Sequence, residues 1–417
     1  MRVLIVSNHF PVNLSTSTHG VHKRLKMFIE AIKDIAEIDI LFYVPCDVNT
    51  SPSSVTQFEH SLSKYFNAAI RLFLCRRFDY KKSKAKWWLY CAGAFSFLSQ
   101  PDYIGTGTIQ QVRALESCLC HNPDAVFVHR LSAMGPFLVT RKSFPPVFFD
   151  LDDIEHIAFK RGIRYIRKTR TRLLNYILLP ALFWGQYRSI RLSDRTFVCS
   201  EVDRQFLVDH YRLKGVVSIP NAVRIPDPQP VATEQALLFI GSYLHKPNID
   251  AAEFLIKRIW PHIHEVLPTA TLIIAGFPPE KIPSYGSDIP GISFTGFVED
   301  LDGLYRKSRV VCAPILSGSG TRVKIIEAAA YGKPVVSTAM GAEGIQMDHG
   351  KEIFLYDNPN AFAKACIELL SDPGLCDRMG SAARAVVISK YDKKIVQRLI
   401  QKHLKIGNDN IDNLRAN

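Results

Sequence analysis

The sequence predicts an α/β protein made of two doubly wound domains, each a parallel sheet with helices on both faces. Three observations predict it: apolar, strand-like runs recur along the chain, helical patterns or loops separate most of them, and the runs form two series. The expected strands are residues 2–7, 38–44, 125–131, 147–151 and 196–200 in the first series, and 216–220, 237–241, 271–276, 292–298, 310–314, 334–337 and 352–356 in the second.

The domain boundary is expected just before Val216, where the strand series restarts. The segment from Ile219 to Pro230 contains four prolines, which favour an extended connection over a helix. Ligands of doubly wound sheets bind outside the C-terminal strand ends, so two such domains facing each other predict an interdomain cleft. We expect an N-terminal domain over residues 1–213, a C-terminal domain over 214–389, and a helical tail over 390–417 that packs back on the N-terminal domain.

Residues 45–107 have the least regular pattern in the chain. They include a basic aromatic run, RRFDYKKSKAKWWLY, at residues 76–90. The apolar run WWLYCAGAFSFL, which begins at Trp87, is too short to span a bilayer. We interpret this run as part of the core or as a lining of the acceptor side, the part of the predicted cleft where a second substrate would bind.

The composition is that of a globular protein with an anionic partner. The chain has 417 residues, of which 47% are hydrophobic and 22% charged, and a formal net charge of +13. It has no apolar run of about 18 residues and no signal-peptide pattern at its N-terminus. Nine cysteines without CxxC or zinc-type spacing indicate a reducing, cytoplasmic compartment. Because nothing in the sequence resembles a nucleic-acid-binding module, we expect a nucleotide or an anionic lipid rather than nucleic acid.

The stretch SGSGTRVKIIEAAAYGKPVVSTAMGAEG, from Ser317 to Gly344, is the clearest candidate binding loop. Its glycines allow left-handed backbone and close approach of a ligand, and the helix expected to begin at Thr321 offers free N–H groups to a phosphate. Two cations on the first turn oppose the helix dipole unless an anion is bound, and a carboxylate further along can reach a sugar hydroxyl. The candidate residues are Ser317, Gly318, Ser319, Gly320, Thr321, Arg322, Lys324 and Glu327.

Two further loops could contact the same anion. GSYLHKPN follows an expected strand and precedes a helix, so Gly241 permits a close turn and Lys246 or His245 could supply a cation. Near the N-terminus, Gly20 opens a helix after a long polar loop and is either a phosphate contact or an ordinary turn residue.

The segment FDLDDIEH places three aspartates and a histidine where a strand enters a helix. Aspartate there is either a helix cap or a lining of the cleft, and metal ligation is less favoured because no partner ligands are identified. The acceptor-side candidates are Asp152, Asp153 and His156, with Asp150 beside them.

Residues 160–193 contain no acidic residue, and two basic clusters flank the apolar stretch LLNYILLPALFW. This pattern favours an interfacial helix on an anionic membrane. The alternative is a solvated basic face that leads into a buried helix.

These motifs together resemble the retaining family-4 glycosyltransferases of the GT-B fold, which have two Rossmann-like domains. The resemblance rests on GSGTRVKIIEAAAYGKPVVST with the later GAEG, on VSIPNAVRIP, FIGSYLHKPN and TGFVED, and on HGVHKR near the N-terminus. DLDDIEH and FVCSEVDRQFL are similar to a subgroup associated with cell-surface polysaccharide assembly.

The resemblance implies a nucleotide-diphosphate sugar as donor substrate, with no cofactor and no metal. It implies that Glu327 holds the ribose hydroxyls, that Arg322 and Lys324 lie near the diphosphate, and that Gly20 approaches it from the N-terminal domain. Many members carry a carboxylate eight residues before the helix glutamate, and this chain has Ser319 there. Ser242 and the pair His245–Lys246 stand where the family often has an arginine and a lysine.

The expected function is transfer of a hexose-type sugar to a lipid-linked or polysaccharide acceptor, with retention of configuration, by a cytoplasmic or peripheral membrane enzyme. One alternative is a sugar-nucleotide epimerase with the same fold and donor site. The other is a non-catalytic nucleotide-binding assembly protein. This alternative rests on Ser319, which replaces the carboxylate that many members of the family carry.

Overall fold

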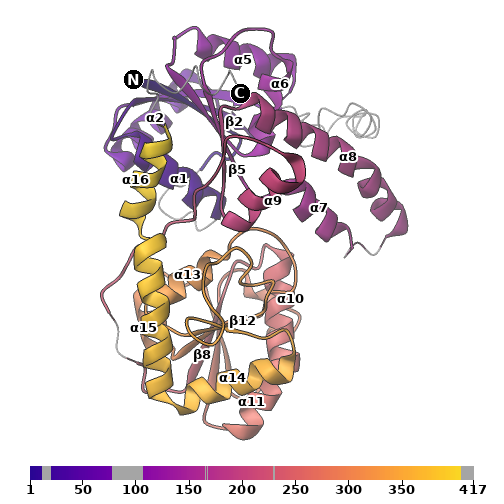
Figure 1. Ribbon diagram of the computed structural model, residues 1–417, viewed down its shortest axis with the longest axis vertical. Coiled ribbons are helices and arrows are strands. Elements are labelled where there is room, and N and C mark those ends of the chain that lie inside the picture. Colours follow the sequence, from indigo (N-terminus) through magenta and orange to yellow (C-terminus); the bar gives the residue numbers. More distant parts are fainter. Residues whose placement is uncertain (12–19, 78–106, 165, 167, 229–230, 405–417) are drawn as a thin grey trace. The chain divides into compact units, whose positions relative to one another are not determined.

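A computed structural model describes residues 1–11, 20–77, 107–164, 166, 168–228 and 231–404 (Figure 1). The chain divides into two compact units, residues 1–219 with 397–417, and residues 220–396. Among the described residues, one unit contains a parallel sheet of seven strands and the other a parallel sheet of six. The predicted α/β class with two doubly wound sheets is confirmed.

The first sheet has the strand order β3-β2-β1-β4-β5-β6-β7, with every neighbouring pair parallel. Its central strands are buried along almost their whole length, as expected for a sheet covered on both faces. The strands are β1 (Arg2–Ser7), β2 (Glu37–Val44), β3 (Ile70–Arg76), β4 (Ala125–His129), β5 (Val147–Asp152), β6 (Arg195–Val198) and β7 (Val216–Ser218).

Both edge strands of this sheet differ from the expectation. Strand β3 lies in the irregular region 45–107, where its part-exposed residues weaken the apolar signal. Strand β7 was assigned to the second series, but it pairs with β6 and closes the first sheet. The first unit therefore continues to Ile219, beyond the expected boundary at residue 213. The basic aromatic run at 78–90 and the apolar run that follows it lie outside the described residues.

Helices cover both faces of the first sheet. On one face, Phe28 of α1 packs against Phe127 and Phe197. The strand residues whose side chains point to the other face of the sheet belong to a second core, which also contains Leu115, Leu182 and other helical side chains. The helices are α1 (Gly20–Ile32), α2 (Pro52–Phe66), α5 (Ile109–Leu119), α6 (Gly135–Val139), α7 (Glu155–Ile163), α8 (Thr169–Leu192) and α9 (Glu201–Tyr211).

The C-terminal part of α16 (Lys393–Leu404) belongs to the first unit from Gln397 onward. The Gln397 side-chain amide donates to the Glu30 carbonyl at 2.8 Å, and that of Gln401 donates to the Ala31 carbonyl at 3.0 Å. Arg195 donates to the His403 carbonyl at 3.0 Å. Residues 397–404 thus pack beside the end of α1.

The second sheet has the strand order β10-β9-β8-β11-β12-β13, again entirely parallel. Helices α10, α11 and α14 cover one face, and α13 and α15 cover the other (Figure 1). The strands are β8 (Ala236–Ile240), β9 (Thr271–Ala275), β10 (Ile292–Gly296), β11 (Val310–Ala313), β12 (Val335–Ser337) and β13 (Phe354–Leu355), and the helices are α10 (Lys246–Phe254), α11 (Trp260–Val266), α12 (Leu301–Lys307), α13 (Val323–Ala330), α14 (Pro359–Ser371) and α15 (Pro373–Lys390).

In the described parts of the chain, no helix has both the length and the apolarity needed to cross a membrane.

Candidate functional site

Each sheet has a topological switch point, the place where the strand order reverses and where doubly wound proteins bind ligands. In the second sheet it lies between β8 and β11, and in the first between β1 and β4. The expected donor loops follow β8 and β11, and the acceptor-side candidates follow β5, next to β4.

The glycine-rich loop after β11 has the backbone that its glycines were expected to allow. Gly318 has a φ of 107° and Gly320 a φ of 76°, both in the region that favours glycine. The helix begins later than expected, at Val323, with Arg322 as its N-cap and no side-chain capping bond. Thr321 precedes the helix, and its hydroxyl accepts a 2.7 Å hydrogen bond from the Asn221 amide.

Lys324 lies at the end of β8. Its ammonium donates to Asn248 Oδ1 at 3.0 Å and lies 4.5 Å from the centroid of the Phe239 ring. A Cβ on Gly241 would lie 3.1 Å from Lys324 Nζ, so only glycine leaves the lysine in this position without strain. Burial, together with the charge of Arg322, lowers the pKa of Lys324 to about 7, although Glu327 opposes the shift.

Arg322 is oriented differently from the expectation. Its guanidinium turns back over the loop and donates to the carbonyls of Ser319 and Gly320, and to that of Ser317 at 3.4 Å. Carbonyl dipoles of its own loop thus satisfy part of the charge of the guanidinium. Arg322 therefore rigidifies the loop that presents Ser317 and Ser319.

Lys246, one of the two cations expected after β8, is the first residue of α10. It is largely exposed and forms an ion pair with Asp250 one turn later in α10, with 2.6 Å between Nζ and Oδ1. The carbonyl of Ser242 instead accepts a 2.8 Å hydrogen bond from the amide of Asn248, which also binds Lys324. Asn248 was missed, although its place two residues into α10 after a Gly-containing turn was readable from the sequence.

Glu327 lines a cavity together with the acidic residues Glu299, Asp300 and Asp302. The rings of Tyr305 and Tyr331 stack beside it, with centroids 4.3 Å apart and planes inclined by 17°. Tyr331 donates its hydroxyl to Asp302, which also binds Arg224 at 2.6 Å. The Tyr305 hydroxyl is buried without a hydrogen-bond partner. Acidic groups and aromatic rings suit a nucleoside better than a phosphate.

In the first domain, α1 begins at Gly20 as expected, and a Cβ there would meet no atom within 4 Å. One turn later, Arg24 is fully buried and donates to both oxygens of Asp150, with Nη2 to Oδ1 at 2.7 Å. Its Nε also lies 3.2 Å from Asp152. Burial works against the charge of Arg24, but the two carboxylates raise its pKa above the usual value.

Two residues at neighbouring strand ends have strained backbone. Arg130, just after β4, has a φ of 73° and a ψ of 149°, and Asp152, which ends β5, has a φ of 65°. Their side chains form an ion pair, so Asp152 lies between the guanidiniums of Arg24 and Arg130. Strained non-glycine backbone of this kind clusters at functional sites.

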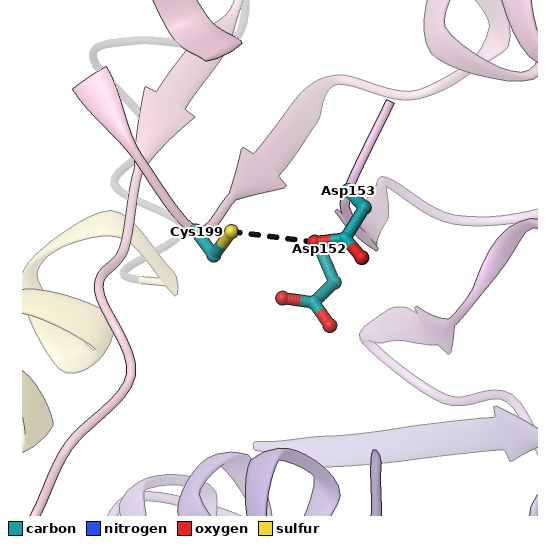
Figure 2. A group of neighbouring side chains, drawn as sticks. All are labelled: Asp152, Asp153 and Cys199. Atoms are coloured by element: carbon teal, nitrogen blue, oxygen red, sulfur yellow. Dashed lines mark hydrogen bonds between the residues drawn. The ribbon is translucent and has the colours of Figure 1, made fainter. Parts of the chain in front are cut away.

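Asp153 lies beside Cys199, whose thiol donates to Asp153 Oδ1 at 3.4 Å (Figure 2). Asp152, Asp153 and Cys199 offer ligand atoms within 4.8 Å of one another. Burial and the neighbouring carboxylates hold the pKa of the Cys199 thiol well above its usual range, and Asp152 already binds two guanidiniums. The group therefore fits a hydrogen-bonded arrangement better than a cation site.

His156 lies in an aromatic cluster and not among the acidic residues. Its Nε2 is 3.0 Å from the Tyr211 hydroxyl, and its ring packs edge-on against Phe183. It is 7% exposed, and burial lowers its pKa. The expectation that His156 acts on the acceptor side is not supported, because the helical turn after Asp153 rotates it onto α8 and α9.

Sequence reasoning missed several residues of the first switch point. Ser7 and His129 are hydrogen-bonded at 3.0 Å between Oγ and Nδ1, and burial keeps the pKa of His129 well below its usual value. Arg24, Arg130 and Cys199 were not singled out either. A basic residue directly after a buried strand, as in VFVHRL, was the available signal for Arg130.

Comparisons with known proteins relate part of the chain to a family. Residues 234–372 match the family model described as glycosyl transferases group 1. An uncharacterized 44.6 kDa protein in the cps region of Klebsiella pneumoniae is 23% identical over 168 residues, which are 38% of this chain and 43% of that protein. The match thus spans less than half of the relative's length.

Two solved structures share the fold over nearly the whole chain. HepE from Anabaena, in complex with UDP and glucose, has a TM-score of 0.61 at 15% identity, and the match covers 96% of this chain and 98% of HepE. WaaG, a glycosyltransferase involved in lipopolysaccharide biosynthesis, has a TM-score of 0.63 at 11% identity, with coverages of 98% and 100%. The second domain thus matches the model of group 1 glycosyl transferases, and the chain as a whole shares the GT-B fold of these two structures.

Proposed function

We propose that this enzyme transfers a hexose-type sugar from a nucleotide-diphosphate sugar to a lipid-linked or polysaccharide acceptor of the cell envelope, with retention of configuration and without a metal. We place it on the cytoplasmic side of the membrane, in peripheral contact with it. The observation that carries the proposal is the position of Lys324. Its Nζ lies 3.0 Å from Asn248 Oδ1, and it would lie 3.1 Å from a Cβ on Gly241.

The diphosphate of the donor would lie at this switch point. As the glycosidic bond breaks, negative charge develops on the leaving nucleoside diphosphate. The ammonium of Lys324 and the uncapped N–H groups at the start of α13 stabilise that charge. Since HepE holds UDP, a UDP-sugar is the first donor to test.

The nucleoside would lie in the cavity beside Glu327. Glu327 accepts hydrogen bonds from ribose hydroxyls, and the acidic lining that includes Glu299 and Asp302 disfavours a phosphate there. The basic loop and the acidic cavity lie in the same domain and together orient the donor, with its diphosphate toward Lys324 and its nucleoside in the cavity. The transferred sugar would then lie near Ser317 and Ser319, on the loop that Arg322 braces.

The acceptor would bind at the switch point of the first domain. Asp153 accepts a hydrogen bond from the acceptor hydroxyl, while Asp152 contributes a fixed negative charge held by Arg24 and Arg130. An acceptor of the cell envelope is supported by the relative from a cps region and by the role of WaaG in lipopolysaccharide biosynthesis.

A donor screen with purified protein tests the proposal. Nucleotide release from a panel of nucleotide sugars is measured with and without a membrane lipid extract, and anomer analysis of the product follows. We expect acceptor-dependent release with one donor, its loss in Glu327→Ala, and its retention in Glu280→Ala, a carboxylate of the short helix Pro279–Lys281 in the same domain. Isomerisation of the donor would favour the epimerase, binding without turnover would favour the assembly protein, and an inverted linkage would refute retention.

A further inference from the structure

Helix α8 exposes an apolar stripe to solvent. Leu173 is 62% exposed, and Tyr176, Ile177 and Trp184 are each 44% exposed. At about 100° per residue, these four side chains fall within an arc of about 100° on the helix surface. Large apolar side chains gathered on one exposed face mark an interaction surface, whereas single ones do not.

The opposite face of α8 already has its partner. Leu178, Leu182 and Ile190 are buried, and the last two belong to the core of the first domain. The stripe is therefore not needed to hold the helix on its domain.

Basic side chains lie at both ends of the stripe. Arg170 and Arg172 are exposed in the first turn of α8, and Arg191 is exposed in the last. The first turn contains no acidic residue and its N-cap makes no side-chain capping bond, so its cations face the positive end of the helix dipole. An anion at this end would relieve that repulsion.

This combination fits the surface of an anionic bilayer. An amphipathic helix lies in the interface with its apolar face at the boundary of head groups and acyl chains, and with its cations at the phosphates. Tyr176 and Trp184 each combine an apolar ring with a polar tip, which suits that boundary. An acidic protein partner would match the arginines but would leave the stripe unexplained.

We propose that α8 is the membrane-docking element of this protein, with Leu173, Tyr176, Ile177 and Trp184 inserted into the head-group boundary of an anionic bilayer. This specifies the surface for the membrane contact in the proposed function. Vesicle binding requires neither donor nor acceptor, so failure of the docking and failure of the enzymatic activity are distinguishable.

The experiment is flotation of the full-length protein with vesicles of phosphatidylcholine alone or mixed with phosphatidylglycerol. We expect binding to the mixed vesicles only, weakened at least about tenfold by Leu173→Ser with Ile177→Ser, and similarly by Arg170→Gln with Arg191→Gln. The matched control for the apolar pair is Ile109→Ser with Val202→Ser, which are 66% and 55% exposed on other helices of the same domain. The basic control is Arg113→Gln with Arg141→Gln, both exposed.

Tryptophan fluorescence gives a second measurement. Trp184 is exposed and Trp260 is buried. In a protein with Trp87→Phe and Trp88→Phe, which removes the other two tryptophans, insertion should shift the emission to shorter wavelength, and Trp184→Phe should abolish most of the shift. The proposal would be overturned if the wild type, the Leu173→Ser/Ile177→Ser variant and the Arg170→Gln/Arg191→Gln variant bound equally. Equal binding of the wild type to both kinds of vesicle would also overturn it. So would a dimer in analytical ultracentrifugation that the Leu173→Ser/Ile177→Ser variant dissociates, because a second copy would then cover the stripe.

Discussion

Arg24 and Asp150 form an ion pair in which the two side chains are 1% and 0% exposed. The residues are 126 positions apart, and three donor–acceptor contacts of 2.7 to 3.0 Å join them. Arg24 also donates to the carbonyl of Ile219, where the chain leaves the first unit for the second, at 3.0 Å. One guanidinium thus links α1, the end of β5 and the segment that follows β7.

Removing one partner of this pair should destabilise the first domain strongly. In Asp150→Asn the buried guanidinium loses its main counter-charge, and we expect a loss of about 3–5 kcal/mol in the free energy of unfolding. Glu37→Gln, which removes an exposed partner of Arg2, should cost less than about 1 kcal/mol. Calorimetry of both variants checks this, and equal melting temperatures would show that the buried pair contributes no more than the exposed one.

The strained backbone of Arg130 can be measured with two substitutions at the same position. Arg130→Ala and Arg130→Gly both remove the ion pair with Asp152, but only glycine adopts a φ of 73° with a ψ of 149° without strain. Arg130→Gly should therefore be more stable than Arg130→Ala by about 1–3 kcal/mol in urea unfolding. At Arg113, in the middle of α5, the order should reverse, since glycine is the worse helix residue there.

The sequence pattern predicted most of the fold because buried parallel strands are continuous apolar runs. It failed to predict β3, where an edge position leaves side chains part-exposed and the apolar signal weak. Chain order also misled the assignment of β7, since a short strand before a proline-rich segment can pair with either sheet.

The candidate site was predictable in its loops and less so in its side-chain orientations. Glycines at positions 318 and 320 indicate a backbone with positive φ, because few other residues adopt that conformation. The rotation of His156 onto an aromatic cluster, the turn of Arg322 onto its own loop, and the pairing of Lys246 with Asp250 depend on neighbours that spacing alone does not specify.

Two glycine substitutions should separate a packing role from a ligand role. Gly241→Ala places a methyl group 3.0 Å from Asn248 Cγ and 3.1 Å from Lys324 Nζ, so it should displace the lysine and weaken binding of UDP roughly tenfold or more. Gly20→Ala meets open space, so stability should change by less than about 0.5 kcal/mol. If Gly20 approaches the donor diphosphate, turnover of Gly20→Ala falls with stability unchanged; unchanged turnover would remove Gly20 from the site.

Ser319 should affect the sugar and not the nucleotide. In the proposed arrangement the diphosphate binds Lys324 and the ribose binds Glu327, so Ser319→Ala should leave the dissociation constant of UDP within about twofold of wild type. Its turnover with the preferred UDP-sugar should fall, because a hydroxyl beside the transferred sugar is lost. Isothermal titration with UDP and steady-state kinetics compare the two effects, and weaker UDP binding by Ser319→Ala would contradict the arrangement.

Lys324 should make nucleotide binding depend on pH. Burial lowers its pKa to about 7, so above pH 7 the ligand-free lysine is increasingly neutral, whereas a bound diphosphate favours the protonated form. Binding must then take up a proton, and the affinity for UDP should fall by up to about tenfold per pH unit between pH 7 and 8.5. Titration calorimetry in buffers of different ionisation enthalpy measures both the affinity and the proton uptake.

Two variants show whether that slope belongs to Lys324. Lys324→Gln should bind UDP weakly at every pH and without proton uptake, whereas Lys246→Gln, which lacks an exposed and ion-paired lysine, should keep the wild-type slope. Without ligand, the sign of the effect on stability is opposite. The charged lysine is a cost to folding below pH 7, and this cost declines as the pH rises toward 10.5, the ordinary value for lysine. Lys324→Met should therefore stabilise the ligand-free second domain at pH 6 more than at pH 9, and an equal effect at both would refute the lowered pKa.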